Sequence, residues 1–314
     1  MVGKLTKRCA VMNFGRVNFN KVLEKLNDKF EHVQVLEDLP DLKNTEVQVL
    51  CIVGGDGSMR RTAEYLMSEK IDLPLLGIAG GTANLGPLIR FDLHRLDFLD
   101  ESNFFVYPVD CLEVSVNGKT VGFAFVDVVL SSFVVGFTGN TVENLDPEFF
   151  SRGSFVEGIK KAVGDGRTKF SRNGVELDHG INEIKQVIAS PSNPKNRFAG
   201  RLASGICAWT SFHEHSGVLT VSEDFLLDAD LRRDETTGRD FIRISQILFG
   251  SGDVIGVENL RDGTALILDG EPTISLKHTD HVRIGIVEDA VKVVSNLPKS
   301  LDLAPIGDVG RLHR

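Results

Sequence analysis

The sequence has no surplus of positive charge, since lysine and arginine total 35 against 44 aspartates and glutamates, a net charge of -9. Proteins that bind nucleic acid usually present a basic face, so this balance argues against a nucleic-acid partner. It leaves room for a small anionic ligand, because backbone N–H groups bind phosphate in acidic proteins too.

The sequence contains few cysteines. The four thiols are far apart and form no CxxC pair: Cys9, Cys51, Cys111 and Cys207. We therefore expect reduced, mostly buried thiols and a cytoplasmic protein.

Long uncharged hydrophobic runs are missing as well. The most apolar stretch, 121–137, carries Asp127 at its centre, and a carboxylate is costly in lipid. Its valines and phenylalanines favour strands, so we expect two buried strands or one long strand and no integral membrane segment. The basic residues near the N-terminus are followed by no apolar core, so a signal peptide is not expected.

The length of 314 residues exceeds one average domain, so two domains are expected. The first alternates short apolar strands with helical periods, which predicts a doubly wound, mostly parallel α/β sheet. Its strands are expected at 8–12, 33–36, 47–53 and 73–78, and its helices at 18–30, 59–67 and 83–90. Ligands of such sheets bind beyond the carboxyl ends of the strands.

After Pro108 the pattern changes to apolar alternation with turn signals such as Asn117-Gly118, which predicts a β-rich domain. Strands are expected at 111–116, 120–130, 187–189, 217–221, 253–259, 264–269 and 282–287, a helix at 155–163 and a solvated loop at 232–240. The expected domains are thus 1–108 and 109–290, and 291–314 either returns to the first domain or trails off.

A glycine-built turn follows the third predicted strand. Its residues are Gly54, Gly55, Asp56, Gly57 and Ser58, and a helical stretch comes next. Glycines let backbone N–H groups approach an anion, and a helix N-terminus adds its positive end. A carboxylate within such an anion-binding turn is suited to take a proton from an attacking hydroxyl or to hold a metal. The plain alternative is a strand–turn–helix connection that merely needs glycine.

A second glycine loop follows the next strand, at Gly80-Gly81-Thr82-Ala83-Asn84-Leu85-Gly86-Pro87. Gly81 permits close approach, Thr82 offers a hydroxyl and Asn84 an amide donor. The plain alternative is that Thr82 caps a helix, which is compatible with phosphate binding. Because both glycine loops lie at carboxyl ends of neighbouring strands, we expect them to converge on one crevice.

Acidic residues mark the β-rich half. Asp127 lies among apolar residues, where a carboxylate needs a partner, a ligand or solvent; the alternative is a solvent-facing strand position. Asp269-Gly270-Glu271 places two carboxylates at a turn, for which a surface hairpin is the favoured interpretation. His213 and His215 share a strand face in principle, but no third metal ligand is evident, so we expect exposed histidines.

These motifs resemble the superfamily that joins NAD kinases and diacylglycerol or other lipid kinases. Gly54–Gly57 matches its GGDG signature, Gly81–Asn84 is similar to the GT-x-N motif of lipid kinases, and Asp269–Glu271 to their DGE motif. Asp127 lies in a strand similar to the one where NAD kinases carry an Asn–acid pair, with Val126 in place of the Asn.

The likeness is closest to the AcoX-like branch of NAD-kinase-related proteins. The features shared with that branch are Arg60, Pro74-Leu75-Leu76, Gly81–Pro87, Asp127-Val128 and Leu268–Glu271. The resemblance implies a nucleotide-binding α/β domain, a β-rich acceptor-binding domain and transfer of phosphate from ATP with Mg²⁺ to an alcohol hydroxyl.

The resemblance also implies roles for single residues. The candidate bases are Asp56, as in NAD kinases, and Asp269, as in lipid kinases. The residues that would bind the donor phosphates are Gly54, Gly55, Gly57, Ser58, Gly81, Thr82 and Asn84. Asp127 and Glu271 would lie on the acceptor side, Glu271 also supporting the base or the metal. The acceptor stays open between NAD, a lipid and a small diol, and a homo-oligomer is expected; the alternative is a nucleotide-binding regulator without transfer activity.

Overall fold

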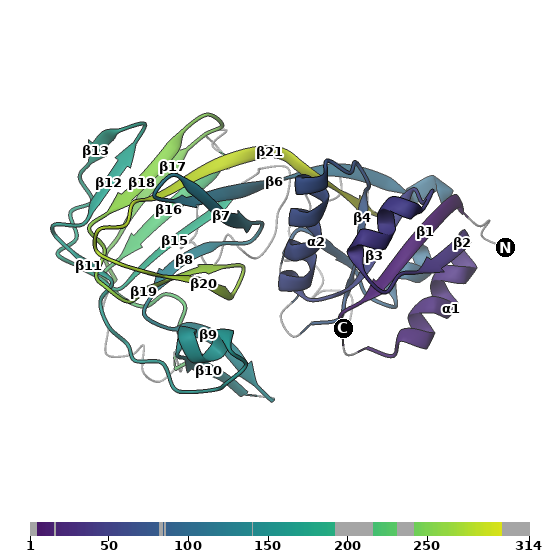
Figure 1. Cartoon of the computed structure of the whole chain (residues 1–314), viewed down its shortest axis with the longest axis horizontal. Coiled ribbons are helices and arrows are strands. Elements are labelled where there is room, and N and C mark those ends of the chain that lie inside the picture. Colours follow the sequence, from purple (N-terminus) through teal and green to yellow (C-terminus); the bar gives the residue numbers. More distant parts are fainter. Residues whose placement is uncertain are drawn as a thin grey trace, which may run out of the picture. The chain divides into compact units, whose positions relative to one another are not determined.

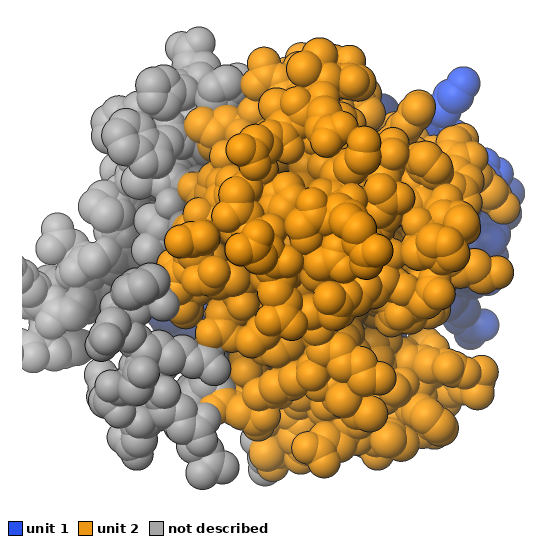
Figure 2. All heavy atoms as spheres, turned by 90° about the vertical axis from the view of Figure 1, so that its left-hand side faces the viewer, with its two compact units in different colours: residues 1–109, 193–198, 291–314 blue, residues 110–192, 199–290 orange. Residues whose placement is uncertain are grey.

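The computed structural model describes residues 5–15, 17–81, 84, 86–139, 141–191, 216–230 and 242–296. The predictions for Thr82, Cys207, His213, His215 and the loop at 232–240 lie outside these residues. The described chain divides into two compact units, coloured separately in Figure 2. One holds the residues up to Val109 and from Val291 onward, and the other those from Asp110 to Ala290. We call them the α/β unit and the β-rich unit.

The α/β unit is built on a parallel sheet (Figure 1). Its strands are β1 (Leu5–Asn13), β2 (Phe30–Val35), β3 (Val49–Gly54), β4 (Leu75–Ala79), β5 (Ile89–Phe91) and the end of β21 (Val282–Ser295). Its helices are α1 (Phe19–Lys29), α2 (Asp56–Glu69) and the short η1 (Leu39–Asn44), η2 (Arg95–Phe98) and η3 (Glu101–Asn103). The strand order β21-β4-β3-β1-β2 is parallel at every pairing.

The order of the strands reverses between β1 and β3. The connection through α1 leads from β1 outward to β2, whereas the connection through α2 leads from β3 to β4 in the opposite direction. Since such crossovers are right-handed, the two helices lie on opposite faces of the sheet. A sheet of this kind has its ligand crevice at the carboxyl ends of the strands where the order reverses.

Local sequence explains where the helices begin and end. The Asn18 side chain accepts a 3.4 Å hydrogen bond from the Lys21 N–H and caps α1, whose residues Val22 and Leu26 are buried in the core. Helix α2 begins directly at the glycine turn and ends at Lys70, which adopts the left-handed conformation. The predicted helices at 18–30 and 59–67 are confirmed within a few residues.

The β-rich unit contains a six-stranded antiparallel sheet in the order β17-β16-β15-β8-β19-β20. Its strands are β8 (Val128–Ser131), β15 (Gln186–Pro191), β16 (Gly217–Ser222), β17 (Ile244–Phe249), β19 (Thr264–Leu268) and β20 (Glu271–Leu276). A second layer comprises β6 (Phe105–Val116), β7 (Lys119–Ala124), β12 (Lys169–Arg172), β13 (Val175–Leu177), β18 (Val254–Glu258) and β21.

Apolar side chains from both layers form the main core of this unit. Leu112, Phe170 and Ile255 of one layer pack in the same cluster as Leu130 and Leu266 of the other. Side chains alternate along each strand, so each layer turns one face into the shared core, as in a β-sandwich. Remaining elements are β9 (Val134–Thr138), β10 (Thr141–Leu145), α3 (Pro147–Ser151), β11 (Gly164–Asp165) and β14 (Glu183–Ile184). The other face of the six-stranded sheet packs against residues of β9, β10 and α3 in a smaller cluster.

Two helix predictions are wrong. Instead of a helix over 83–90, the described residues there lead into the strand β5. No described residue of 155–163 is helical; Phe155 and Ile159 are 59% and 63% exposed, so their spacing does not mark a buried helix face. The apolar stretch at 120–130 forms two strands, β7 and β8, and Asp127, between them, is 8% exposed rather than solvent-facing.

The predicted fold class is confirmed, a doubly wound α/β part and a β-rich part. Strands β6 and β21 each run across the boundary between the units, and Val293 of β21 pairs with Leu75 of β4. Cys9, Cys51 and Cys111 are buried free thiols. Among the described residues, every helix is too short or too polar to cross a membrane.

Candidate active site

Three loops meet at the carboxyl ends of β1, β3 and β4 in the α/β unit. The Phe14 N–H, just after β1, donates to the Val53 carbonyl at 2.8 Å, and the Gly80 N–H, just after β4, donates to the Gly54 carbonyl at 2.9 Å. These bonds continue the strand pairing into the loops. The predicted convergence of the two glycine loops is therefore present, and the loop after β1 joins them.

The glycines are required by how closely these loops pack. A Cβ on Gly81 would lie 2.5 Å from the Gly55 Cα, and one on Gly15 would lie 3.0 Å from the Gly80 Cα. Backbone is thus in contact with backbone, which only glycine permits. The glycines are therefore needed for this packing, and the same packing gathers backbone N–H groups at one edge of the sheet.

Helix α2 begins inside this cluster without a side-chain cap. Gly55 is the N-cap residue and makes no side-chain hydrogen bond, and Asp56, Gly57 and Ser58 form the first turn of a 14-residue helix. The first N–H groups of a helix have no partner within the helix. Together with the helix dipole they form a site that suits a phosphate or another anion.

Asp56 fastens the two glycine loops to each other. Its Oδ1 accepts a 2.8 Å hydrogen bond from the backbone N–H of Gly86. Within the second loop Asn84 is in the left-handed conformation, with φ of 52°, and its amide bonds both the N–H and the carbonyl of Gly81, at 3.0 and 2.7 Å. Asn84 thus shapes its own loop. The sequence had predicted only a phosphate contact for this residue.

Sequence reasoning missed the loop after β1 as part of the site. Asn13 Oδ1 accepts the Gly15 N–H at 3.1 Å and tightens that loop. The available signal was Gly15, two residues after the end of a strand whose residues 9–12 are buried; glycines just after a buried strand also marked the other two loops. Arg60, one of the residues shared with the AcoX-like branch, is 8% exposed and pairs with Glu64 one turn later at 2.9 Å.

The acidic residues of the β-rich unit form a second cluster. Asp269 and Gly270 are the two turn residues between β19 and β20, with φ of 49° and 78°. Positive φ at both central positions is typical of the two-residue hairpin turn that Asp-Gly favours. The predicted hairpin is therefore present. The Asp269 carboxylate, however, accepts three hydrogen bonds from the backbone N–H groups of Phe125, Val126 and Asp127, at 2.9, 2.8 and 3.1 Å.

The pKa of Asp269 is raised from 3.8 to about 7. Burial is the main cause and the charge of the neighbouring Asp127 adds to it, while the three N–H bonds oppose the shift. The structure therefore brings two of the predicted acids, Asp127 and Asp269, to one place. Glu271 begins β20, where it pairs with Leu268 across the turn, and is partly exposed. Asp56 belongs to the other unit.

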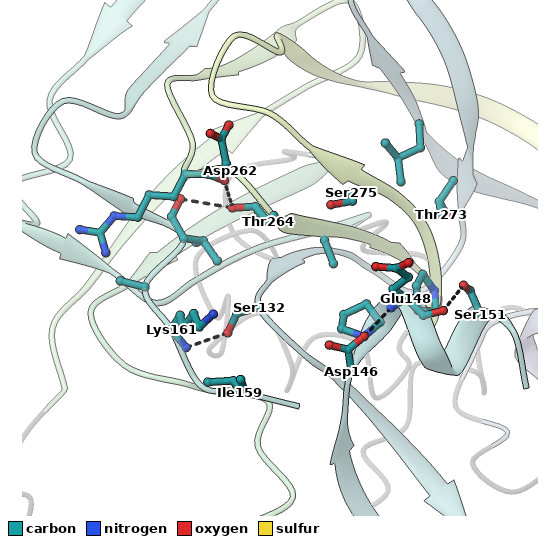
Figure 3. A pocket seen from close by; sticks show the side chains of 18 residues that line it. Ser132, Asp146, Glu148, Ser151, Ile159, Lys161, Asp262, Thr264, Thr273 and Ser275 are labelled. Atoms are coloured by element: carbon teal, nitrogen blue, oxygen red, sulfur yellow. Dashed lines mark hydrogen bonds between the residues drawn. The ribbon is translucent and has the colours of Figure 1, made fainter. Parts of the chain in front are cut away.

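The β-rich unit also holds a cavity of about 550 Å³ (Figure 3). Its walls come from α3, from the segment around Lys161 and from β19 and β20. Side chains with hydroxyl groups line much of it: Ser132, Ser151, Thr264, Thr273 and Ser275. Several of these hydroxyls bond the protein itself; Thr264 donates to the Arg261 carbonyl at 2.7 Å, and Ser132 accepts the Lys161 N–H at 2.9 Å.

Within the described ranges, no three carboxylate, imidazole or thiol groups lie close enough together to hold a metal ion. Mg²⁺ at phosphoryl-transfer sites is usually bound through one or two carboxylates and the substrate phosphates, without a full protein cage. Asp56, the carboxylate among the glycine loops, is compatible with that mode of binding.

No family model matches the sequence, and no curated protein matches it significantly. Solved structures do match. An NAD kinase from Archaeoglobus fulgidus in complex with ATP is 14% identical with a TM-score of 0.52, over 94% of this chain and 95% of that one. A diacylglycerol kinase from Bacillus anthracis is 14% identical with a TM-score of 0.55, over 93% and 98%.

Yeast NADH kinase complexed with NADH is 12% identical with a TM-score of 0.58, over 98% of this chain and 89% of that one. The chain therefore has the two-part fold that NAD kinase and diacylglycerol kinase structures share. The resemblance deduced from the motifs is confirmed at the level of the fold.

Proposed function

We propose that the protein is an ATP-dependent phosphotransferase that acts on an alcohol hydroxyl. The observation that carries the proposal is the junction of the glycine loops after β3 and β4 around the uncapped start of α2, with Asp56 at its centre. The ATP complex of the Archaeoglobus fulgidus NAD kinase, which has the same fold, supports ATP as the donor.

In this proposal the N–H groups at Gly55, Gly57 and Ser58 bind the donor phosphates, and Gly81, Thr82 and Asn84 complete the cradle. Mg²⁺, when bound with the donor, neutralises charge on the transferred phosphoryl group. Asp56 is the first candidate to take the proton of the attacking hydroxyl and Asp269 the second. A general base contributes about 10²–10⁴-fold in rate.

The acceptor belongs to the β-rich unit, with Asp127 and Glu271 as its polar contacts. NAD, a lipid and a small diol are the candidate acceptors. We also propose that the protein works in the cytoplasm as a homo-oligomer, without nucleic acid.

A second candidate function is a nucleotide-binding regulator without transfer activity. It is favoured by Val126, which stands where NAD kinases carry the Asn of their Asn–acid pair. The regulator would keep the phosphate cradle of the α/β unit and lack the acceptor contacts.

The test is an ATP-consumption screen with NAD, diacylglycerol vesicles, sphingoid bases and small diols, read out by mass spectrometry of the phosphorylated product. Asp56→Asn serves as the matched control for contaminating kinases. The proposal expects a product with the wild type and a loss of about 10²–10⁴-fold in Asp56→Asn. ATP binding by thermal shift without any product would favour the regulator, and no ATP binding at all would exclude both.

A further inference from the structure

Four hydrogen bonds join the turn at Asp269 to the segment 125–127 in the β-rich unit. Asp269 Oδ1 accepts the N–H groups of Val126 and Asp127, at 2.8 and 3.1 Å, and Oδ2 accepts that of Phe125 at 2.9 Å. In return the Asp269 N–H donates to the Asp127 carbonyl at 3.0 Å. One short side chain thus binds three successive backbone groups.

The segment depends on these bonds. Residues 125–127 lie between β7, which ends at Ala124, and β8, which begins at Val128, so they take no part in either ladder. Phe125, Val126 and Asp127 are only 1%, 8% and 8% exposed. Buried backbone N–H groups need an acceptor, and the acceptor for all three is the Asp269 carboxylate.

The turn geometry brings that carboxylate to the segment. Leu268 pairs with Val128 across the sheet, so Asp269 follows at the next register position, opposite Asp127. Its φ of 49° is a conformation that aspartate and asparagine adopt far more readily than other side-chain-bearing residues. Both the backbone conformation and the side-chain contacts therefore select a short acidic or amide residue here.

We infer that Asp269 is a positioning residue, whose carboxylate holds the backbone of 125–127 and thereby fixes Asp127 for the acceptor, instead of acting as the base. The inference rests on the proposed function for the role of Asp127. A base must offer a lone pair to the incoming proton. Three of the carboxylate's roughly four lone-pair sites already accept N–H donors, so most of its accepting capacity holds the segment 125–127.

The first measurement is backbone amide exchange, by NMR, of Phe125, Val126 and Asp127 in the wild type, Asp269→Asn and Asp269→Ala. Asparagine keeps one acceptor oxygen, whereas alanine keeps none. We expect exchange of these three amides to rise at least tenfold in Asp269→Ala and less in Asp269→Asn. The matched control is Asp280→Asn, because Asp280 likewise accepts a backbone N–H, that of Lys277, at a turn of the same unit. Unchanged exchange in Asp269→Ala would overturn the inference.

The second measurement uses the acceptor found in the screen and compares kcat and KM for Asp127→Asn, Asp269→Asn and the double variant. If Asp269 acts through Asp127, the Asp269 substitution costs less than about twofold in the Asp127→Asn background, and the KM for ATP stays unchanged. Asp269→Asn should also retain more activity than Asp269→Ala. An equal loss of about 10²–10⁴-fold in both backgrounds, the same for Asn and Ala, identifies a base and overturns the inference.

The proposed function and the positioning role of Asp269 are tested by separate outcomes. A wild type that phosphorylates no acceptor contradicts the proposed function. The exchange measurement needs no turnover, so it still decides whether Asp269 holds the segment 125–127.

Discussion

The Asp56 carboxylate accepts a 2.8 Å hydrogen bond from the backbone N–H of Gly86, thirty residues later in the chain. The bond ties the turn after β3 to the loop after β4, at the start of helix α2. Asp56 therefore has a structural task that is independent of any role as a base.

Two substitutions separate these tasks. In Asp56→Asn the amide oxygen still accepts the Gly86 N–H, whereas in Asp56→Ala the bond is lost. If Asp56 is the base, both variants lose about 10²–10⁴-fold in kcat, but only Asp56→Ala also weakens ATP binding. Isothermal titration with ATP beside steady-state kinetics measures both effects. Full turnover in Asp56→Asn would contradict the assignment of the base.

Gly81→Ala tests the packing of the glycine loops. The added Cβ would lie 2.5 Å from the Gly55 Cα, so the loops must move apart. We expect the affinity for ATP to fall by at least about tenfold, which corresponds to about 1.4 kcal/mol. The control is Gly166→Ala, because a Cβ at Gly166 would meet no atom within 4 Å. Equal affinities in the two variants would show that the loops do not bind the donor.

Gln186 connects the six-stranded sheet to the chain after β16. Its side chain is fully buried and bonds the N–H groups of Leu226 and Leu227, at 2.8 and 2.9 Å, and the Leu227 carbonyl at 2.8 Å. Gln186→Leu removes these partners, and we expect the free energy of unfolding to fall by about 1–3 kcal/mol. Urea denaturation measures it, with the exposed Gln34→Leu as control, expected within about 0.5 kcal/mol of the wild type. Equal loss in both variants would contradict the role of Gln186.

The raised pKa of Asp269 predicts a pH dependence of stability. Because its pKa in the folded protein is about 7, above the ordinary value of 3.8, the folded state binds the proton more tightly than the unfolded chain. This contribution is complete below pH 3.8 and is lost as the pH rises to about 7. The wild type should therefore lose stability between about pH 4 and pH 7 relative to Asp269→Asn.

Melting temperatures of both proteins between pH 4 and pH 8 check this slope. Asp100→Asn is the control, because the Ser102 hydroxyl lowers the pKa of Asp100 and its contribution is lost only below the ordinary value. Its curve should parallel that of the wild type across the same range. Parallel curves for Asp269→Asn and the wild type would contradict the raised pKa.

Sequence reasoning succeeded where one local signal dominates. The α1 helix was predicted from the helical period of its apolar residues, and two of them, Val22 and Leu26, are buried in the core. It failed at 155–163, where Phe155 and Ile159 have helical spacing but are exposed. Periodicity reports a buried face only if a core covers that face, and the core is a property of the tertiary structure.

The sequence by itself determined the alternation of strands and helices, the glycine turns at strand ends and the class of fold, because these follow from local periodicity and glycine chemistry. Only the tertiary structure decided that Asp56 ties two loops together and that Asp269 holds three backbone N–H groups. Both contacts join residues that are distant in the chain, Asp269 to a segment more than 140 residues earlier. Such contacts depend on which strands become neighbours in the folded sheets, and strand neighbours that are far apart in the chain are chosen only when the whole core packs.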